Sequence, residues 1–167
     1  MRLRKLNDKD APLMLEWMHD PDVVSKMQTN FQSKTLEDCL AFIEIANEDK
    51  TNLHLAIVND EDEYMGTVSL KHIVDRSAEF AITVRKCAMG AGYSKYGMKT
   101  ILEIGLKELN LNSIYWCVSP ENVRAVRFYD KNGYKRIKAE DDLLKMILQN
   151  GTYSEKQINE YIWYEER

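Results

Sequence analysis

The fold is decided by the stretch Ile82-Thr-Val-Arg-Lys-Cys-Ala-Met-Gly-Ala-Gly-Tyr-Ser-Lys-Tyr-Gly-Met-Lys-Thr-Ile-Leu102, which runs from an alternating strand through a loop into an amphipathic helix. Gly90 and Gly92 permit a tight turn and a close approach of the backbone to a ligand. The first N–H groups of the following helix have no partner within that helix and lie at the positive end of its dipole. The stretch therefore predicts an anion site that suits a phosphorylated cofactor.

Spacing separates this loop from two better-known glycine patterns. The dinucleotide fingerprint G-x-G-x-x-G requires glycine where Lys95 stands, and no second βαβ unit accompanies it. The phosphate-loop pattern G-x-x-x-x-G-K-[ST] is approached by Gly92 to Gly97, but Met98 precedes Lys99 and turns that lysine by about 100° around a helix. An ordinary strand-to-helix turn remains the alternative from the loop alone.

A third pattern, [QR]-x-x-G-x-[GA] between a strand and a long helix, resembles the acetyl-coenzyme A loop of the GNAT superfamily of N-acetyltransferases. Gly92 takes the central glycine, Ser94 the last small position and Met89 the position of Gln or Arg. Because Met89 lacks a polar side chain, the resemblance implies that main-chain N–H groups contact the pyrophosphate. The cofactor-binding residues implied for this loop are Met89, Gly90, Ala91, Gly92, Tyr93 and Ser94.

A second motif lies further along the chain, in Ser119-Pro-Glu-Asn-Val-Arg-Ala-Val-Arg-Phe-Tyr-Asp-Lys-Asn-Gly-Tyr134. A serine N-cap and an Asn-Gly stop predict a helix from about Pro120 to Lys131. Asn122, Ala125 and Tyr129 fall on one face of it, and a core-facing alanine and tyrosine are the plain alternative. The pattern resembles the second GNAT motif, N-x-x-A-x-x-x-Y followed by a glycine and an aromatic residue, and it adds Asn122 to the implied cofactor-binding residues.

The order of predicted elements also resembles the GNAT fold over nearly the whole chain. Periodicity predicts strands at Arg2–Leu6, Leu53–Val58, Tyr64–Leu70, Ala78–Val84, Ser113–Val118 and Tyr134–Ala139, with Tyr161–Tyr164 as an edge strand. Helices are predicted after Pro12, after Thr35 and after Gly92, and residues 140–155 look like a helix-bearing or loose insertion.

The resemblance implies a single α/β (α+β) domain over residues 1–167, with helices on both faces of a mixed central sheet. That sheet is expected to splay between the strand ending at Val84 and the one ending at Val118, which leaves a slot for the pantetheine arm. The N-terminal helices and the loop before Ala78 are then expected to form the acceptor pocket.

Acetyl transfer requires that an amine with a pKa near 10.4 lose a proton before it attacks. Glu79 is the candidate base, and a strand glutamate that faces solvent or pairs with a basic neighbour is the alternative. The resemblance places Tyr129 beside the coenzyme sulfur as the acid, and a main-chain N–H near Val84 at the oxyanion. No acyl-enzyme is needed, so Cys87 and Cys117 are interpreted as packing residues.

Composition bounds the remaining possibilities. The chain has 167 residues, a net charge of −4 and no apolar run of the roughly 20 residues that span a membrane, so no nucleic-acid or membrane partner is expected. Three scattered cysteines and three dispersed histidines predict no disulfide framework and no metal site. We expect a cytoplasmic monomer or homodimer.

The sequence favours a small-molecule amine, with an amino sugar on a nucleotide as the preferred class. Aromatic, histidine, arginine and lysine residues in the segments Trp17–Phe31 and Lys71–Ala78 suit sugar stacking and phosphate pairing. An acetyltransferase of protein N-termini and a non-catalytic acyl-coenzyme A sensor remain the alternatives, although a sensor has no need of Tyr129.

Overall fold

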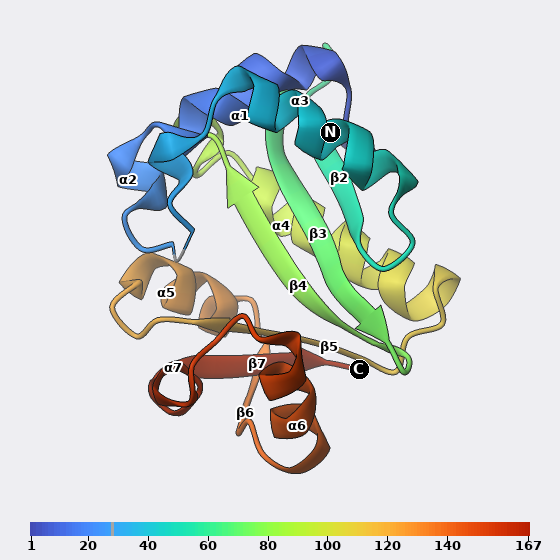
Figure 1. The fold of residues 1–167 in the computed structure, drawn as a ribbon, viewed down its shortest axis with the longest axis vertical. Coiled ribbons are helices and arrows are strands. Elements are labelled where there is room, and N and C mark those ends of the chain that lie inside the picture. The colour runs from blue at the N-terminus through green and yellow to red at the C-terminus, as the bar shows by residue number, and fades with distance from the viewer. Residues whose placement is uncertain (28) are drawn as a thin grey trace.

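The computed structural model describes residues 1–27 and 29–167, and the strands in this part join into one seven-stranded sheet (Figure 1). The strands are β1 (Arg2–Lys5), β2 (Leu53–Val58), β3 (Tyr64–Val74), β4 (Ser77–Val84), β5 (Ser113–Val118), β6 (Lys135–Ile137) and β7 (Ile162–Glu166). The α-helices are α1 (Ala11–Met18), α2 (Pro21–Val24), α3 (Leu36–Glu48), α4 (Tyr93–Glu103), α5 (Val123–Lys131), α6 (Asp141–Asn150) and α7 (Glu155–Glu160). Short helical turns are η1 (Asp8–Asp10), η2 (Phe31–Ser33), η3 (Lys86–Ala88) and η4 (Ile104–Glu108).

The sheet has the order β1-β2-β3-β4-β5-β7-β6, and its pairs are antiparallel except for β4 with β5. The two parallel strands run together at one end and diverge toward the other, as Figure 1 shows. This arrangement confirms the mixed, splayed sheet and the helix-flanked α/β fold that the resemblance implied.

Strand alternation divides the apolar side chains between the two faces of the sheet. On β2, Ile57 packs into a core with α4 and α5, while its neighbours Ala56 and Val58 pack into a second core with α1 and α3. On β5, Trp116 joins the first core, whereas Tyr115 joins a third cluster with α6 and α7. Each face of the sheet is therefore covered by helices.

The local signals fixed most helix starts. Thr35 caps α3 in a reciprocal capping box with Asp38, and the α1 helix ends at Met18, with His19 as its C-cap. The predicted start of α5 at Pro120 was wrong, because Asn122 is the N-cap and accepts a hydrogen bond from the Ala125 N–H at 3.3 Å. Pro120 belongs instead to a turn closed by the Asn122 N–H and the Ser119 carbonyl.

The C-terminal strand was placed at the wrong position in the sheet. β7 was predicted as an edge strand, yet it pairs with β5 on one side and with β6 on the other. Ile162, Trp163 and Tyr164 supply side chains to both faces, as an interior strand requires. The segment 140–155 contains helix α6 and leads into α7, and both helices pack on β5 and β7 through Ile147 and Ile158.

Gly66 on β3 allows β4 to lie close, and this contact generates a stability prediction. Gly66 pairs with Val84, and a Cβ added there would meet the Thr83 carbonyl oxygen at 2.5 Å and the Val84 Cα at 3.0 Å. We expect Gly66→Ala to lower the free energy of unfolding by about 1–3 kcal/mol, because backbone atoms must shift.

Denaturant unfolding checks this expectation. Lys156→Ala is the control, since its long 4.0 Å ion pair with Glu160 is exposed, and it should change stability by less than about 0.5 kcal/mol. Equal midpoints for the wild type and Gly66→Ala would contradict the predicted strain.

Candidate active site

The central feature of the site is the region between β4 and β5 beyond the end of their ladder, which is called the slot below. The parallel ladder joins only three pairs, Ser77 with Ser113, Ala78 with Ile114 and Glu79 with Tyr115. Beyond Glu79 the two strands continue without pairing, so the backbone of one strand no longer satisfies that of the other. Such unpaired groups are available to a ligand that enters between the strands.

The direction of the backbone groups along β4 follows from one recorded hydrogen bond. The Arg85 N–H donates to the Met65 carbonyl at 2.9 Å, which lies on the β3 side. Because N–H groups alternate sides along a strand, those of Val84 and Ile82 point toward β5 and into the slot. Val84 therefore presents the kind of main-chain donor that stabilises an oxyanion.

The loop after β4 leads into a helix whose start favours anions. Gly90 has φ 80° and Gly92 has φ 91°, a left-handed conformation that glycine adopts at little cost. Gly92 is the N-cap of α4, and no described side chain caps its first turn. A Cβ added at Gly90 would meet no described atom within 4 Å, so this side of the loop is open. Ala91 precedes this N-cap, and Tyr93 and Ser94 are the first residues of α4.

Met89 departs from the family pattern, but a cation lies beside it. The guanidinium of Arg124, in the first turn of α5, contacts the Met89 sulfur at 2.9 Å. A guanidinium is charged at every physiological pH. The loop therefore has a permanent positive charge nearby, although it comes from α5 and not from the loop itself.

Tyr129 lies on α5, and its side chain belongs to an aromatic cluster between that helix and the sheet. Its ring lies 5.6 Å from that of Trp116 and 5.1 Å from that of Tyr164, and the side chain is buried. Burial raises the pKa of Tyr129, so the hydroxyl stays protonated through the neutral range. Asn122 uses its side-chain oxygen as the cap of α5, which leaves its NH₂ group for other partners.

Glu79 lies on the opposite face, at the last pair of the ladder, and is only 2% exposed. Its carboxylate accepts a hydrogen bond from the Tyr153 hydroxyl at 2.8 Å, and the Lys71 ammonium lies 4.0 Å away. The carboxylate is thus buried and hydrogen-bonded, which excludes the alternative that Glu79 faces solvent. Tyr153 was missed in the sequence, because nothing local indicates a contact between residues 74 positions apart.

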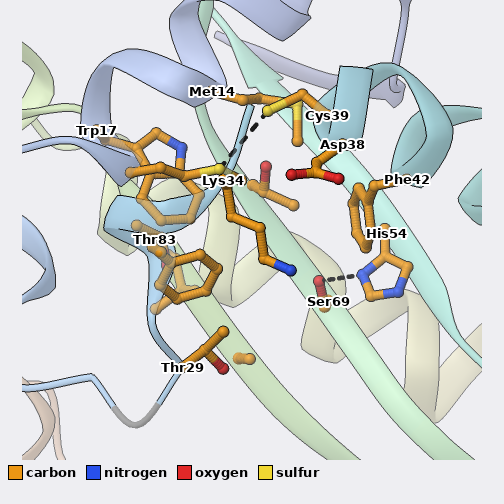
Figure 2. A pocket seen from close by; sticks show the side chains of 15 residues that line it. Met14, Trp17, Thr29, Lys34, Asp38, Cys39, Phe42, His54, Ser69 and Thr83 are labelled. Atoms are coloured by element: carbon orange, nitrogen blue, oxygen red, sulfur yellow. Dashed lines mark hydrogen bonds between the residues drawn. The ribbon is translucent and has the colours of Figure 1, made fainter. Parts of the chain in front are cut away.

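A cavity of about 310 Å³ adjoins β4 on the Glu79 face of the sheet (Figure 2). Its walls come from α1, η2, α3 and the strands β2 to β4, and Ala81, Ile82 and Thr83 of β4 form part of its floor. Trp17 and Phe31 meet edge to face with ring centroids 5.0 Å apart. The cavity is thus largely apolar and aromatic, as small-molecule sites commonly are.

A few polar groups project into this cavity. Figure 2 shows the Lys34 side chain running across it and the Asp38 carboxylate near that side chain. Hydrogen bonds from Thr35 lower the pKa of Asp38, so this carboxylate is ionised at neutral pH. Burial and the nearby Lys71 lower the pKa of His54, whose Nδ1 lies 2.6 Å from Ser69 Oγ. The described lining thus balances one cation against one anion.

Several predicted roles changed once the residues were placed. The segment Lys71–Ala78 extends β3 and turns into β4, and its residues do not line the cavity. Of the segment Trp17–Phe31, the cavity is lined by Trp17, Met18, Thr29 and Phe31, while Gln28 lies outside the described residues.

The cysteines divide into different environments. Cys87 was interpreted as a packing residue, but it is exposed because it lies in the turn η3. Cys117 is half-buried, and burial raises its pKa to about 12, which makes it a poor nucleophile at neutral pH. No cluster of potential metal ligands occurs among the described residues, and no described helix is long and apolar enough to cross a membrane.

Comparisons with known proteins agree with this geometry. Residues 1–135 match the family described as Acetyltransferase (GNAT) domain. Acetyltransferase PseH of Campylobacter jejuni is 22% identical over 144 residues, 86% of this chain and 88% of that protein. Spermidine N(1)-acetyltransferase of Escherichia coli is 28% identical over 160 residues, 92% of this chain and 81% of that protein.

Solved structures share the fold. The spermidine N-acetyltransferase from Vibrio cholerae, in complex with CoA and spermine, superposes with a TM-score of 0.72 at 22% identity and covers 81% of each chain. A dodecameric structure of the Vibrio cholerae enzyme gives a TM-score of 0.69 at 20% identity and covers 99% of this chain and 92% of that chain.

Proposed function

The chain belongs to the acetyltransferase (GNAT) domain family and is an acetyl-coenzyme A-dependent N-acetyltransferase, and we propose that its acceptor is the primary amine of a small metabolite, with an amino sugar as the favoured class. One observation carries the proposal. Ala81, Ile82 and Thr83 border the cavity, and the same residues lie beyond the end of the β4–β5 ladder, at the slot. An amine held in the cavity thus lies against the strand that lines the cofactor slot.

The residues around the slot suit the cofactor. We assign the pyrophosphate to the main-chain N–H groups of the loop Met89–Ser94 and the pantetheine to the β4 edge at Val84. The open left-handed glycines and the uncapped start of α4 support this assignment. The side-chain NH₂ of Asn122 is the group we expect to contact the pantetheine arm.

Proton bookkeeping defines the catalytic roles. Acetyl-coenzyme A, when bound, supplies the thioester that the amine attacks and the thiolate that departs. Of the three hydrogens on the ammonium form of the acceptor, one stays on the amide, one reaches solvent, and one restores the Tyr129 hydroxyl after that group has protonated the thiolate. We assign Glu79 to remove the proton that precedes attack, and the Val84 N–H to stabilise the oxyanion.

Tyr129 is assigned to the departing thiolate. Its raised pKa keeps the hydroxyl protonated and available as a donor to sulfur. The Cys117 thiol lies within electrostatic range of both Tyr129 and Glu79, which supports their placement around one reaction centre.

The charge of the cavity favours an amino sugar over a polyamine. A polyamine carries several positive charges, and in the described lining Asp38 is opposed by the cation of Lys34. A sugar ring instead stacks on aromatic walls such as Trp17 and Phe31, and an anionic substituent pairs with Lys34. Spermidine remains a second candidate because relatives that share 28% identity carry that activity in their names.

Cofactor binding generates the first functional prediction. Gly92→Glu adds bulk and negative charge where the pyrophosphate is assigned, so the variant should lose the thermal stabilisation by acetyl-coenzyme A, worth about 2.7 kcal/mol at 100 times Kd. Gly151→Glu is the matched control, because Gly151 is also left-handed but lies at the C-cap of α6. A stabilisation in Gly92→Glu equal to that of the control would remove the loop from the cofactor site.

The assignment of Tyr129 as the acid generates the second functional prediction. Tyr129→Phe keeps the ring contacts and should keep coenzyme A affinity, while kcat falls on the order of 10²-fold. Tyr134→Phe, in the same aromatic cluster, is the control and should keep wild-type kcat. Steady-state kinetics and calorimetry separate the two parameters, and a Tyr129→Phe enzyme with full kcat would leave the thiolate to be protonated by water.

The proposed class of acceptor generates the third functional prediction. A thiol-release assay with nucleotide-linked and free amino sugars, spermidine, aminoglycosides and N-terminal peptides should give its highest kcat/KM with an amino sugar. Lys34→Met should reduce turnover of an acceptor with an anionic substituent by more than that of its neutral analogue, since Lys34 is the cation in the cavity. Preferred turnover of spermidine or of peptides would overturn the amino-sugar assignment and leave the acetyltransferase intact.

A further inference from the structure

Tyr153 contacts the carboxylate proposed as the base, and it comes from outside the family match. It lies in the turn between α6 and α7, whereas the match ends at residue 135. Its hydroxyl donates to Glu79 Oε1 at 2.8 Å. The C-terminal segment of this chain therefore reaches the end of the β4–β5 ladder.

The Tyr153 ring is held in place by its neighbours. It packs edge to face against Trp163 at 5.6 Å and against Tyr161 at 6.2 Å. The Trp163 indole N–H in turn donates to the Ile158 carbonyl of α7 at 3.0 Å. The position of the hydroxyl is thus set by β7 and α7 before any substrate arrives.

The groups that face Glu79 come from three parts of the fold. Lys71 on β3 lies 4.0 Å away with a partly exposed side chain, so its attraction is screened. Tyr115 on β5 is the direct ladder partner, and burial together with the charge of Glu79 raises its pKa to about 12. Cys117 on β5 is a second polar neighbour of the Tyr153 hydroxyl.

Among these neighbours, Tyr153 is the one that donates a hydrogen bond to the Glu79 carboxylate. Burial, with the neighbouring Cys117 and Glu79, raises the pKa of Tyr153, so it keeps its proton and the carboxylate is the acceptor. A hydrogen bond donated to a carboxylate stabilises the ionised form. It also fixes one carboxylate oxygen and leaves the other for an incoming N–H.

We propose that Tyr153 is a positioning residue for the base Glu79, an inference that rests on the proposed function. Tyr153 orients the carboxylate through its hydrogen bond, while Glu79 alone takes the proton from the acceptor ammonium. Tyr153 retains its own proton throughout, so no further proton carrier is required.

The pH dependence of kcat/KM tests this role. Loss of the donor in Tyr153→Phe removes a hydrogen bond that favours the ionised carboxylate over the protonated one. The acidic limb of the profile should therefore move about one unit to higher pH, with rates converging at high pH. Tyr161→Phe, in the same segment and in contact with the Tyr153 ring, is the control and should keep the wild-type limb.

A double-mutant cycle separates this inference from the proposed function. Glu79→Gln should remove the acidic limb and lower kcat/KM on the plateau above it, and Tyr153→Phe should cause no further loss in that background. If Glu79→Gln leaves the profile unchanged, the assignment of the base is wrong. If Glu79→Gln is impaired but Tyr153→Phe keeps the wild-type limb, only the positioning role is overturned.

An NMR measurement on the wild type keeps the test independent of folding of the variants. The Tyr153 ring carbon next to the hydroxyl should change its shift as Glu79 titrates, and this change should vanish in Glu79→Gln. A Tyr153 signal that does not respond to pH in the wild type, while Glu79 titrates, would overturn the inference.

Discussion

The early end of the β4–β5 ladder is the constraint on which the rest of the site depends. Two parallel strands that stay paired satisfy each other's backbone groups and leave nothing for a ligand. Here pairing stops after Glu79 and Tyr115, and the aromatic side chains of Phe80 and Trp116 follow directly on the α4 and α5 face, with ring centroids 5.4 Å apart. The separation therefore creates a slot with backbone donors along one edge and a filled aromatic core beneath it.

The side chains that we propose as base and acid lie on opposite faces of the sheet, because strand alternation turns Glu79 away from the face that α5 covers. Glu79 belongs to the face that carries the cavity, and Tyr129 belongs to the face covered by α4 and α5. On the proposed roles, one proton leaves the amine on the Glu79 side of the slot while another reaches the sulfur on the Tyr129 side.

Short-range sequence patterns were sufficient to predict the strands, the glycine loop and most helix caps. Alternation placed Glu79, Ala81 and Thr83 on one face, and Gly92 was recognised as the start of a long helix. Contacts between distant segments were not accessible in this way. The interior position of β7 depends on pairing with β5 and β6, and the hydrogen bond of Tyr153 joins residues 74 positions apart. The start of α5 was predicted wrongly for another reason. Ser119 and Asn122 both make good caps, and only the backbone geometry decides between them.

Met89 shows that a chain can lack the polar residue of a motif and still have a positive charge beside that position. The family pattern has a polar side chain in the loop at this position, and this chain has a thioether there. The Arg124 guanidinium nevertheless lies 2.9 Å from the Met89 sulfur, on the first turn of α5. An anion at the start of α4 feels the nearby cation irrespective of the element that carries it, since Coulomb attraction depends on distance and dielectric and not on chain order. A motif search scores the missing side chain as a loss, whereas the folded chain keeps a positive charge at the loop.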